Sequence, residues 1–138
     1  MSLKDVPIEI FGVPLLAEKV VDDIIFQLYE NRIFYVRIPR LRRVDMSIVA
    51  NGYAFLDEHG GGTFKNIYHF DYFSDVDPQI REWASDESGN LYTISDAIVI
   101  ESFAQKILTD FYVRVNRPIK PTKIFYSLEK AIAWTHEQ

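Results

Sequence analysis

The chain contains no cysteine, and this excludes disulfide bonds, thiolate metal sites and cysteine nucleophiles. A protein without thiols fits a reducing compartment, so we expect a cytoplasmic location. Long apolar runs are also missing, because the stretch 11–17 is short, contains Pro14 and lies between Glu9 and Glu18. Such a stretch is too short to span a bilayer and makes a poor signal peptide. We therefore expect no membrane partner.

Positive charge is scarce. The 15 lysines and arginines are outnumbered by 20 aspartates and glutamates, which gives a net charge of -5 at pH 7. Broad binding to nucleic acid depends on clustered cations, so this partner is not expected either. The remaining composition, 48% hydrophobic and 14% aromatic in 138 residues, is that of a globular domain with its own core. We predict a single domain over residues 1–138.

The first predicted elements form an antiparallel hairpin. Two runs rich in β-forming residues, 23–30 and 33–39, are separated by Asn31-Arg32, a pair that suits a tight turn. In the second run both alternating faces are largely apolar, which indicates a strand that is covered on two sides.

Helices and strands alternate after the hairpin. Residues 45–59 carry apolar side chains at helical spacing, with Asp45 as N-cap and Gly60 beyond the last turn. Gly52 weakens this helix by roughly 1 kcal/mol relative to alanine, which indicates that another backbone passes close to it. Further strands are predicted at 63–70, 97–100 and 122–126. Further helices start at Asp77-Pro78, at Ser102 and at Ser127, and the first of these ends at Gly89.

These elements predict an α/β fold. Each strand-helix-strand step should be a right-handed crossover between parallel strands. The result is a mixed sheet, with an N-terminal antiparallel hairpin followed by three such crossovers and about four helices. The helix that starts at Ser102 has an apolar stripe that runs toward Asn116: Phe103, Ile107, Leu108, Phe111, Tyr112 and Val115.

Segments within residues 94–138 carry a family likeness: Ala97-Ile98-Val99-Ile100-Glu101-Ser102, Asn116-Arg117-Pro118, Pro121-Thr122-Lys123-Ile124-Phe125, and then Glu129, Ala131 and Trp134. They resemble small uncharacterised bacterial domains with a STAS-like, anti-sigma-factor-antagonist-like fold. The resemblance implies a sheet with helices packed on it. It also implies protein-protein interaction or small-ligand sensing, without catalysis.

The resemblance also directs attention to one possible phosphorylation site. STAS antagonists present a phosphorylatable serine or threonine in a short turn, after a strand and at the start of a helix. The comparable stretch here, 71–77, lacks the small Ser-Gly turn and offers only Ser74. The phosphorylation turn of these antagonists is therefore matched here only at Ser74.

Polar residues follow several of the predicted strands. Ligands of open parallel sheets bind beyond the carboxyl ends of the strands, where helix N-termini offer free N–H groups to anions. We call the candidates at this edge the predicted rim: Arg40, Arg42, Arg43, Ser74, Asp75 and Ser102. Together with Arg37, these arginines could grip a phosphate or an acidic partner. A solvated loop is the simpler interpretation in an acidic chain.

Neither a metal, a cofactor nor a catalytic group is predicted. The acidic stretch 71–77 lacks the glycine that an EF-hand loop requires, and the three histidines have no metal-ligand spacing. His69 beside Ser74 or Ser102 would suit a hydrolase. A serine nucleophile, however, also needs an ordered base and oxyanion donors, which no motif here supplies.

Two functions from different classes remain open. The first is a non-enzymatic regulatory or protein-interaction domain that binds a protein partner, or a second copy of itself, through a helix face or the predicted rim. The second is a small-ligand or anion-binding domain that uses the carboxyl edge of the sheet. Exposed aromatic side chains, such as Tyr72 and Phe73, would favour the first. An enclosed apolar pocket would favour the second.

Overall fold

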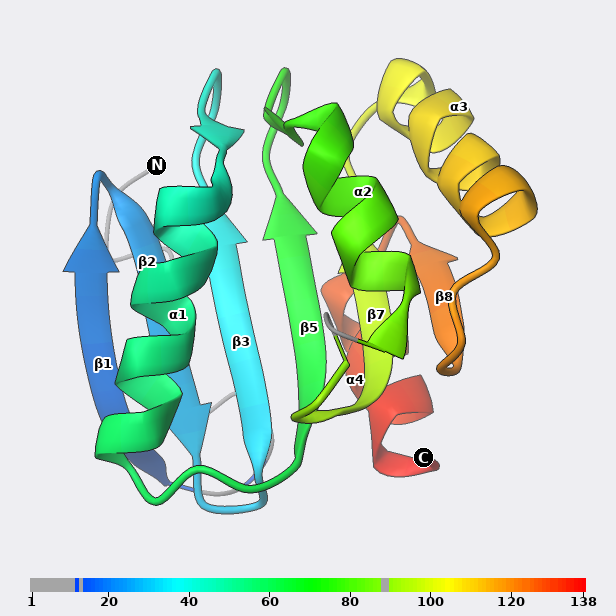
Figure 1. Ribbon diagram of the computed structural model, residues 1–138. Coiled ribbons are helices and arrows are strands. Elements are labelled where there is room, and N and C mark those ends of the chain that lie inside the picture. Colours follow the sequence, from blue (N-terminus) through cyan, green and yellow to red (C-terminus); the bar gives the residue numbers. More distant parts are fainter. Residues whose placement is uncertain (1–11, 13, 88–89) are drawn as a thin grey trace.

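A computed structural model describes residues 12, 14–87 and 90–138. Within these residues six strands form the main sheet in the order β1-β2-β3-β5-β7-β8 (Figure 1). The strands are β1 (Leu15–Val21), β2 (Ile24–Tyr29), β3 (Ile33–Ile38), β5 (Phe64–Phe70), β7 (Thr93–Val99) and β8 (Thr122–Phe125). The pairs β1–β2 and β2–β3 are antiparallel, whereas β3, β5, β7 and β8 run parallel.

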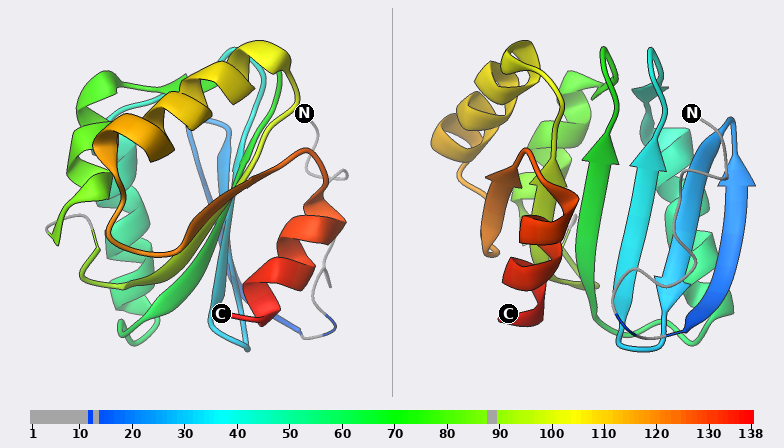
Figure 2. Two further views of the ribbon diagram at one scale, coloured as in Figure 1. Left: turned by 90° about the vertical axis from the view of Figure 1, so that its right-hand side faces the viewer. Right: turned by 180° about the vertical axis from the view of Figure 1, so that it is seen from behind.

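Four α-helices connect and cover the strands in the described part of the chain: α1 (Met46–Glu58), α2 (Pro78–Ser85), α3 (Phe103–Phe111) and α4 (Leu128–His136). Figure 2 shows α1, α2 and α3 on one face of the sheet and α4 on the other. The predicted α/β class, with an antiparallel start and three parallel crossovers, is confirmed.

Strand β3 is buried on both faces, as its sequence predicts. Phe34 and Val36 belong to the core under α1, while Ile33 and Tyr35 belong to the core under α4. All six residues of β2 are buried as well. The two cores therefore meet at the middle of the sheet and fix the register of its antiparallel half.

The helix starts are confirmed, because capping depends on local sequence. The Asp45 carboxylate accepts a hydrogen bond from the Ile48 N–H, and Ser102 forms a capping box with Gln105. Helix α3 continues as a π-helical segment, Tyr112–Asn116. Helix α2 ends at Ser85, and its predicted end at Gly89 lies outside the described residues.

Three further features differ from the sequence prediction or add to it. Strand β1 was not predicted; its apolar residues fall on both faces, with Glu18 and Lys19 between them, so no period of two is visible. A two-residue pair, β4 (Arg43–Val44) and β6 (Asp75–Val76), forms a small second sheet. The predicted backbone neighbour of Gly52 is wrong, because the nearest atoms to an added Cβ belong to the rings of Phe26 and Phe34 at 3.8 and 3.9 Å.

Candidate functional site

Two arginines of the predicted rim are held by aspartates. Arg42 contacts Asp23 at 2.9 Å, and Arg43 contacts Asp77 at 2.9 Å and Asp75 at 3.5 Å. The parallel pairing of β4 with β6 places Arg43 directly opposite Asp75. An anion at this position would have to compete with these carboxylates.

Arg40 of the predicted rim and the nearby Arg37 lie against different groups. Arg37 contacts Asp71 at 3.3 Å. Arg40 is exposed, and its guanidinium lies 5.5 Å from the centre of the Phe73 ring. The structure therefore spreads the four arginines along the edge of the sheet and does not bring them around one pocket.

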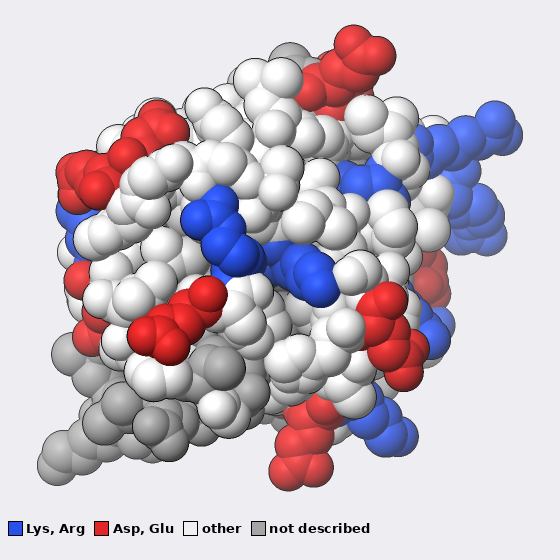
Figure 3. All heavy atoms as spheres, turned by 90° about the horizontal axis from the view of Figure 1, so that it is seen from below, with Lys and Arg blue, Asp and Glu red and all other residues white. Residues whose placement is uncertain are grey.

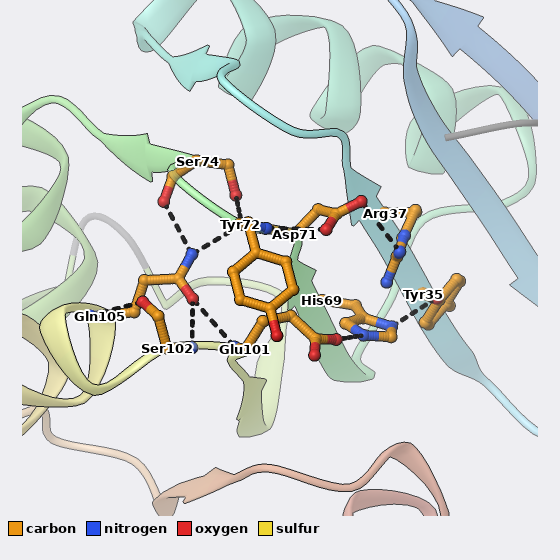
Figure 4. Close-up of polar contacts among 9 residues, drawn as sticks. All are labelled: Tyr35, Arg37, His69, Asp71, Tyr72, Ser74, Glu101, Ser102 and Gln105. Carbon is orange, nitrogen blue, oxygen red and sulfur yellow. Dashed lines mark hydrogen bonds and ion pairs between the residues drawn. The ribbon is translucent and has the colours of Figure 1, made fainter.

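Ser74 and Ser102 both support the start of α3 (Figure 4). The buried Ser74 hydroxyl donates to the Asp71 carbonyl at 2.6 Å, and the Ser102 hydroxyl accepts from the Gln105 backbone N–H at 3.2 Å. The Gln105 side chain in turn donates to the carbonyls of Asp71 and Ser74 at 2.7 and 3.1 Å. These two rim serines thus tie the loop after β5 to helix α3.

His69 lies on the α4 side of the sheet, where both ring nitrogens have partners. Nδ1 is 2.8 Å from the Tyr35 hydroxyl and Nε2 is 3.2 Å from the Glu101 carboxylate. Because a carboxylate only accepts, Nε2 carries the hydrogen and Nδ1 accepts from Tyr35. Burial lowers the pKa of His69 to about 3, and the charge of Arg37 acts in the same direction.

The serine-histidine pair of a hydrolase is not formed. In the described residues the His69 ring bonds Tyr35 and Glu101, while the Ser74 and Ser102 hydroxyls bond main-chain groups of Asp71 and Gln105. No group of three His, Asp or Glu side chains in those residues could hold a metal ion.

A groove between helices and sheet was not predicted from the sequence. We call it the α1–α2 groove; Figure 1 shows α1 in front of the β1–β3 half of the sheet and α2 in front of the β5–β7 half. Its cavity volume is about 200 Å³, and Val49 of α1 and Trp83 of α2 line its walls. Tyr68 and Phe70 of the central strand β5 line it too, and both stay half-buried.

The lining of the α1–α2 groove is mainly apolar, but it includes a buried ion pair. Lys120 Nζ lies 3.0 Å from an Asp96 carboxylate oxygen, and both side chains are more than nine-tenths buried. Lys120 also donates to the Ala84 carbonyl of α2. Burial raises the pKa of Asp96, and the charge of Lys120 opposes that rise.

Asn66 adds buried amide atoms to the lining of the groove. Its amide nitrogen donates to the other Asp96 oxygen at 3.1 Å and to the Thr93 hydroxyl at 3.2 Å. Its amide oxygen is buried and has no hydrogen-bond partner among the described residues. A buried acceptor of this kind costs about 1–3 kcal/mol if nothing satisfies it.

Three tyrosines lie within electrostatic reach of Asp96. Burial raises the pKa of Tyr53 to about 12, and the carboxylate of Asp96 adds to the rise. The same two causes raise the pKa of Tyr68 and of Tyr112. All three line the α1–α2 groove as neutral phenols. The lining of the groove therefore combines aromatic rings with hydroxyl, amide and paired charged groups.

The apolar stripe of α3 points largely away from the core. Five of its side chains are between 46% and 71% exposed: Phe103, Ile107, Leu108, Phe111 and Val115. Tyr112 alone of the predicted stripe is buried. Leu41 and Phe73 at the loop tips are also exposed, 72% and 65%, and each has a positive φ that such residues seldom adopt.

The opposite end of the molecule from the predicted rim carries a mixed charge. Figure 3 shows basic and acidic side chains there, interspersed among uncharged ones. No helix in the described residues is long and apolar enough to cross a membrane.

Two residues of the α1–α2 groove have a signal in the sequence. Asp96 is a charged residue directly before the buried run 97–100, and Lys120 stands between Pro118 and Pro121. A charge next to a buried strand needs a partner. The pairing itself depends on packing that only the structure supplies.

Comparison with known proteins gives one match. A family model described as Domain of unknown function (DUF7793) matches residues 28–138. Neither the curated proteins nor the solved structures contain a match.

Proposed function

The chain belongs to the DUF7793 family, and we propose that it binds a small molecule in the α1–α2 groove as a non-enzymatic regulatory domain. One observation carries the proposal: a cavity of about 200 Å³ has a largely apolar lining that includes Asn66, whose buried amide oxygen has no partner among the described residues. Small-molecule sites typically combine apolar walls with a few polar groups that fix orientation.

The packing of the helices supports this proposal. Protein interiors are normally close-packed, so a helix layer usually covers its sheet completely. Here Tyr68 and Phe70 stay half-buried in the central strand β5, whereas Ile24, Phe26 and Leu28 of β2 are buried in the core under α1. A ligand that lies over β5 would cover the apolar surface that α1 and α2 leave open.

The charged groups in the groove support binding of a ligand without chemical conversion of that ligand. Asp96 and Lys120 bond each other and the surrounding amide groups. Neither is therefore an unpaired acid, base or nucleophile aimed at the groove. An anion at the predicted rim has less support, because Arg37, Arg42 and Arg43 already contact carboxylates. The lack of cysteine supports a reducing location such as the cytoplasm.

A fragment screen by protein-observed NMR tests the proposal. Val49 is half-buried on the groove wall, so Val49→Trp should fill part of the cavity. We expect hits whose chemical-shift changes centre on the α1–α2 groove, and at least a tenfold loss of affinity in Val49→Trp. Val20→Trp, at an exposed position of β1, is the matched control and should bind as the wild type does. Equal binding by both variants, or no hits at all, would contradict the proposal.

A second candidate function rests on the α3 stripe. Its five exposed apolar side chains form a continuous surface at helical spacing. We propose that a second copy of the chain binds there, since one helix stripe can pack against its own copy across a two-fold axis. The STAS-like likeness also fits an interaction role, and it stays a prediction. The oligomeric state of the chain in solution tests this candidate.

A further inference from the structure

We infer that the occupant of the α1–α2 groove is a small, neutral, aromatic molecule that carries an N–H or O–H donor; this inference rests on the proposed function. The size, the walls and the polar end of the groove each restrict the ligand in a different way. Each restriction follows from groups that the structure places there.

The volume limits the ligand to about one or two rings. A cavity of roughly 150 Å³ in another protein holds one benzene molecule. The α1–α2 groove, at about 200 Å³, has room for a bicyclic molecule of slightly larger size. A nucleotide or a long acyl chain would extend well outside it.

The walls favour a flat ring. Tyr53 of α1 meets Trp83 of α2 edge-on, with centroids 5.6 Å apart, and meets Tyr92 edge-on at 5.4 Å. Aromatic rings gain stabilisation from such contacts beyond the area that they bury. A planar ligand between these side chains and Tyr68 would present both faces and edges to aromatic partners.

The ion pair favours a neutral ligand. Asp96 and Lys120 neutralise each other at 3.0 Å, so a charged ligand would lose its hydration without gaining an unpaired counterion. Two other charged residues line the groove. Asp75 contacts Arg43, and Arg81 of α2 is half-buried, so water screens its charge.

The polar end requires a donor. The Asn66 amide nitrogen faces the Asp96 carboxylate, which fixes the orientation of the amide, because the reverse orientation would place two acceptors together. The amide oxygen has no hydrogen-bond partner among the described residues, and Asn66 lines the groove. A ligand N–H or O–H would supply that hydrogen bond, with the Tyr68 and Tyr112 hydroxyls also on the lining.

Three probes of similar shape separate these requirements: indole, benzofuran and indole-2-carboxylate. Indole has an N–H donor, benzofuran has an oxygen in its place, and the carboxylate adds a negative charge. Titrations of the full chain, followed by NMR, should give indole an affinity at least five times that of either relative. In Asn66→Leu, which has no amide oxygen, indole and benzofuran should bind equally.

The outcomes distinguish the inference from the function on which it rests. Equal binding of indole and benzofuran to the wild type would overturn the donor requirement, since water would then satisfy Asn66. Tighter binding of the carboxylate would overturn the requirement for neutrality and indicate a role for Arg81. Failure of all three probes, with other fragments still bound in the groove, would overturn the inference and leave the proposed function intact. If the protein binds no fragment in the groove, both the inference and the proposed function are overturned.

Discussion

His69 joins three neighbouring strands at the carboxyl edge of the sheet. It lies at the end of β5, its Nδ1 accepts from Tyr35 of β3, and its Nε2 donates to Glu101, just beyond β7. Burial holds the pKa of the ring at about 3. The ring is therefore neutral in the fold at any pH at which the protein would be handled.

The pH dependence of folding should reveal this buried ring. In the unfolded chain a histidine has a pKa of about 6.5, so the unfolded state takes up a proton first as the pH falls. The contribution of His69 is thus complete above about pH 6.5 and is lost progressively toward pH 3. Between pH 7.5 and 5 the wild type should lose roughly 2 kcal/mol more unfolding free energy than His69→Gln.

Urea unfolding at several pH values measures this difference. The wild type and His69→Gln are compared at each pH, and the wild type should show the steeper pH dependence. If His69→Gln also kept that dependence, the ring would not be held neutral by the fold.

The candidate residues could be predicted only in part from the sequence. His69 was noticed, but its partners are 34 and 32 residues away and depend on the register of three strands. The rim arginines were placed at the correct edge, yet the pairing of Arg43 with Asp75 depends on the small β4–β6 contact. Asn66, at the polar end of the groove, gave no local signal at all, because one asparagine in a strand has many structural roles.

Helix α1 contains a glycine on its buried side, and the structure leaves room for a methyl group there. A Cβ at Gly52 would lie 3.8 Å from the Phe26 ring, which is an ordinary contact distance. Alanine is the better helix former by roughly 1 kcal/mol. Gly52→Ala should therefore raise the free energy of unfolding by up to about 1 kcal/mol.

Chemical denaturation checks this prediction: the midpoint should rise while the m-value stays unchanged. Ala54→Gly, on the exposed side of the same helix, makes the opposite change and should lower stability by a similar amount. A loss of stability in Gly52→Ala would mean that Phe26 and Phe34 pack too tightly to accept the extra carbon.

Elements were predictable where their signals are local. Caps at Asp45, Ser102 and Ser127 fix the starts of helices, because each side chain bonds an N–H group within three residues. Strand β1 has no such marker and is defined by its pairing with β2. The apolar stripe of α3 was visible in the sequence, but which side of the helix meets the sheet depends on packing over the whole fold.

At the scale of the whole molecule, the α3 stripe is an apolar surface that the described part of the fold does not cover. The α3 stripe offers a second copy a helix face, and Ile107 lies midway along α3, 54% exposed. A buried charge would oppose that contact, so Ile107→Glu should abolish self-association without loss of folding.

Sedimentation equilibrium over a range of concentrations gives the result. We expect a wild-type dimer, a monomeric Ile107→Glu and a dimeric Leu16→Glu, the last being a similar change at an exposed position of β1. If the wild type stays monomeric at high concentration, the proposal that a second copy binds the α3 stripe is wrong. Equal association of both variants would place the contact elsewhere.

The two edges of the sheet limit how copies could aggregate. Strand β8 has only four residues, with Pro121 before it and the exposed Lys123 within it, and β1 carries Glu18 and Lys19. Short edges with charges and proline resist the addition of further strands. Growth of long fibrils by strand addition is therefore disfavoured at both edges. If a second copy binds the α3 stripe, as we propose, that contact would end at two copies and would keep the protein dispersed at high concentration.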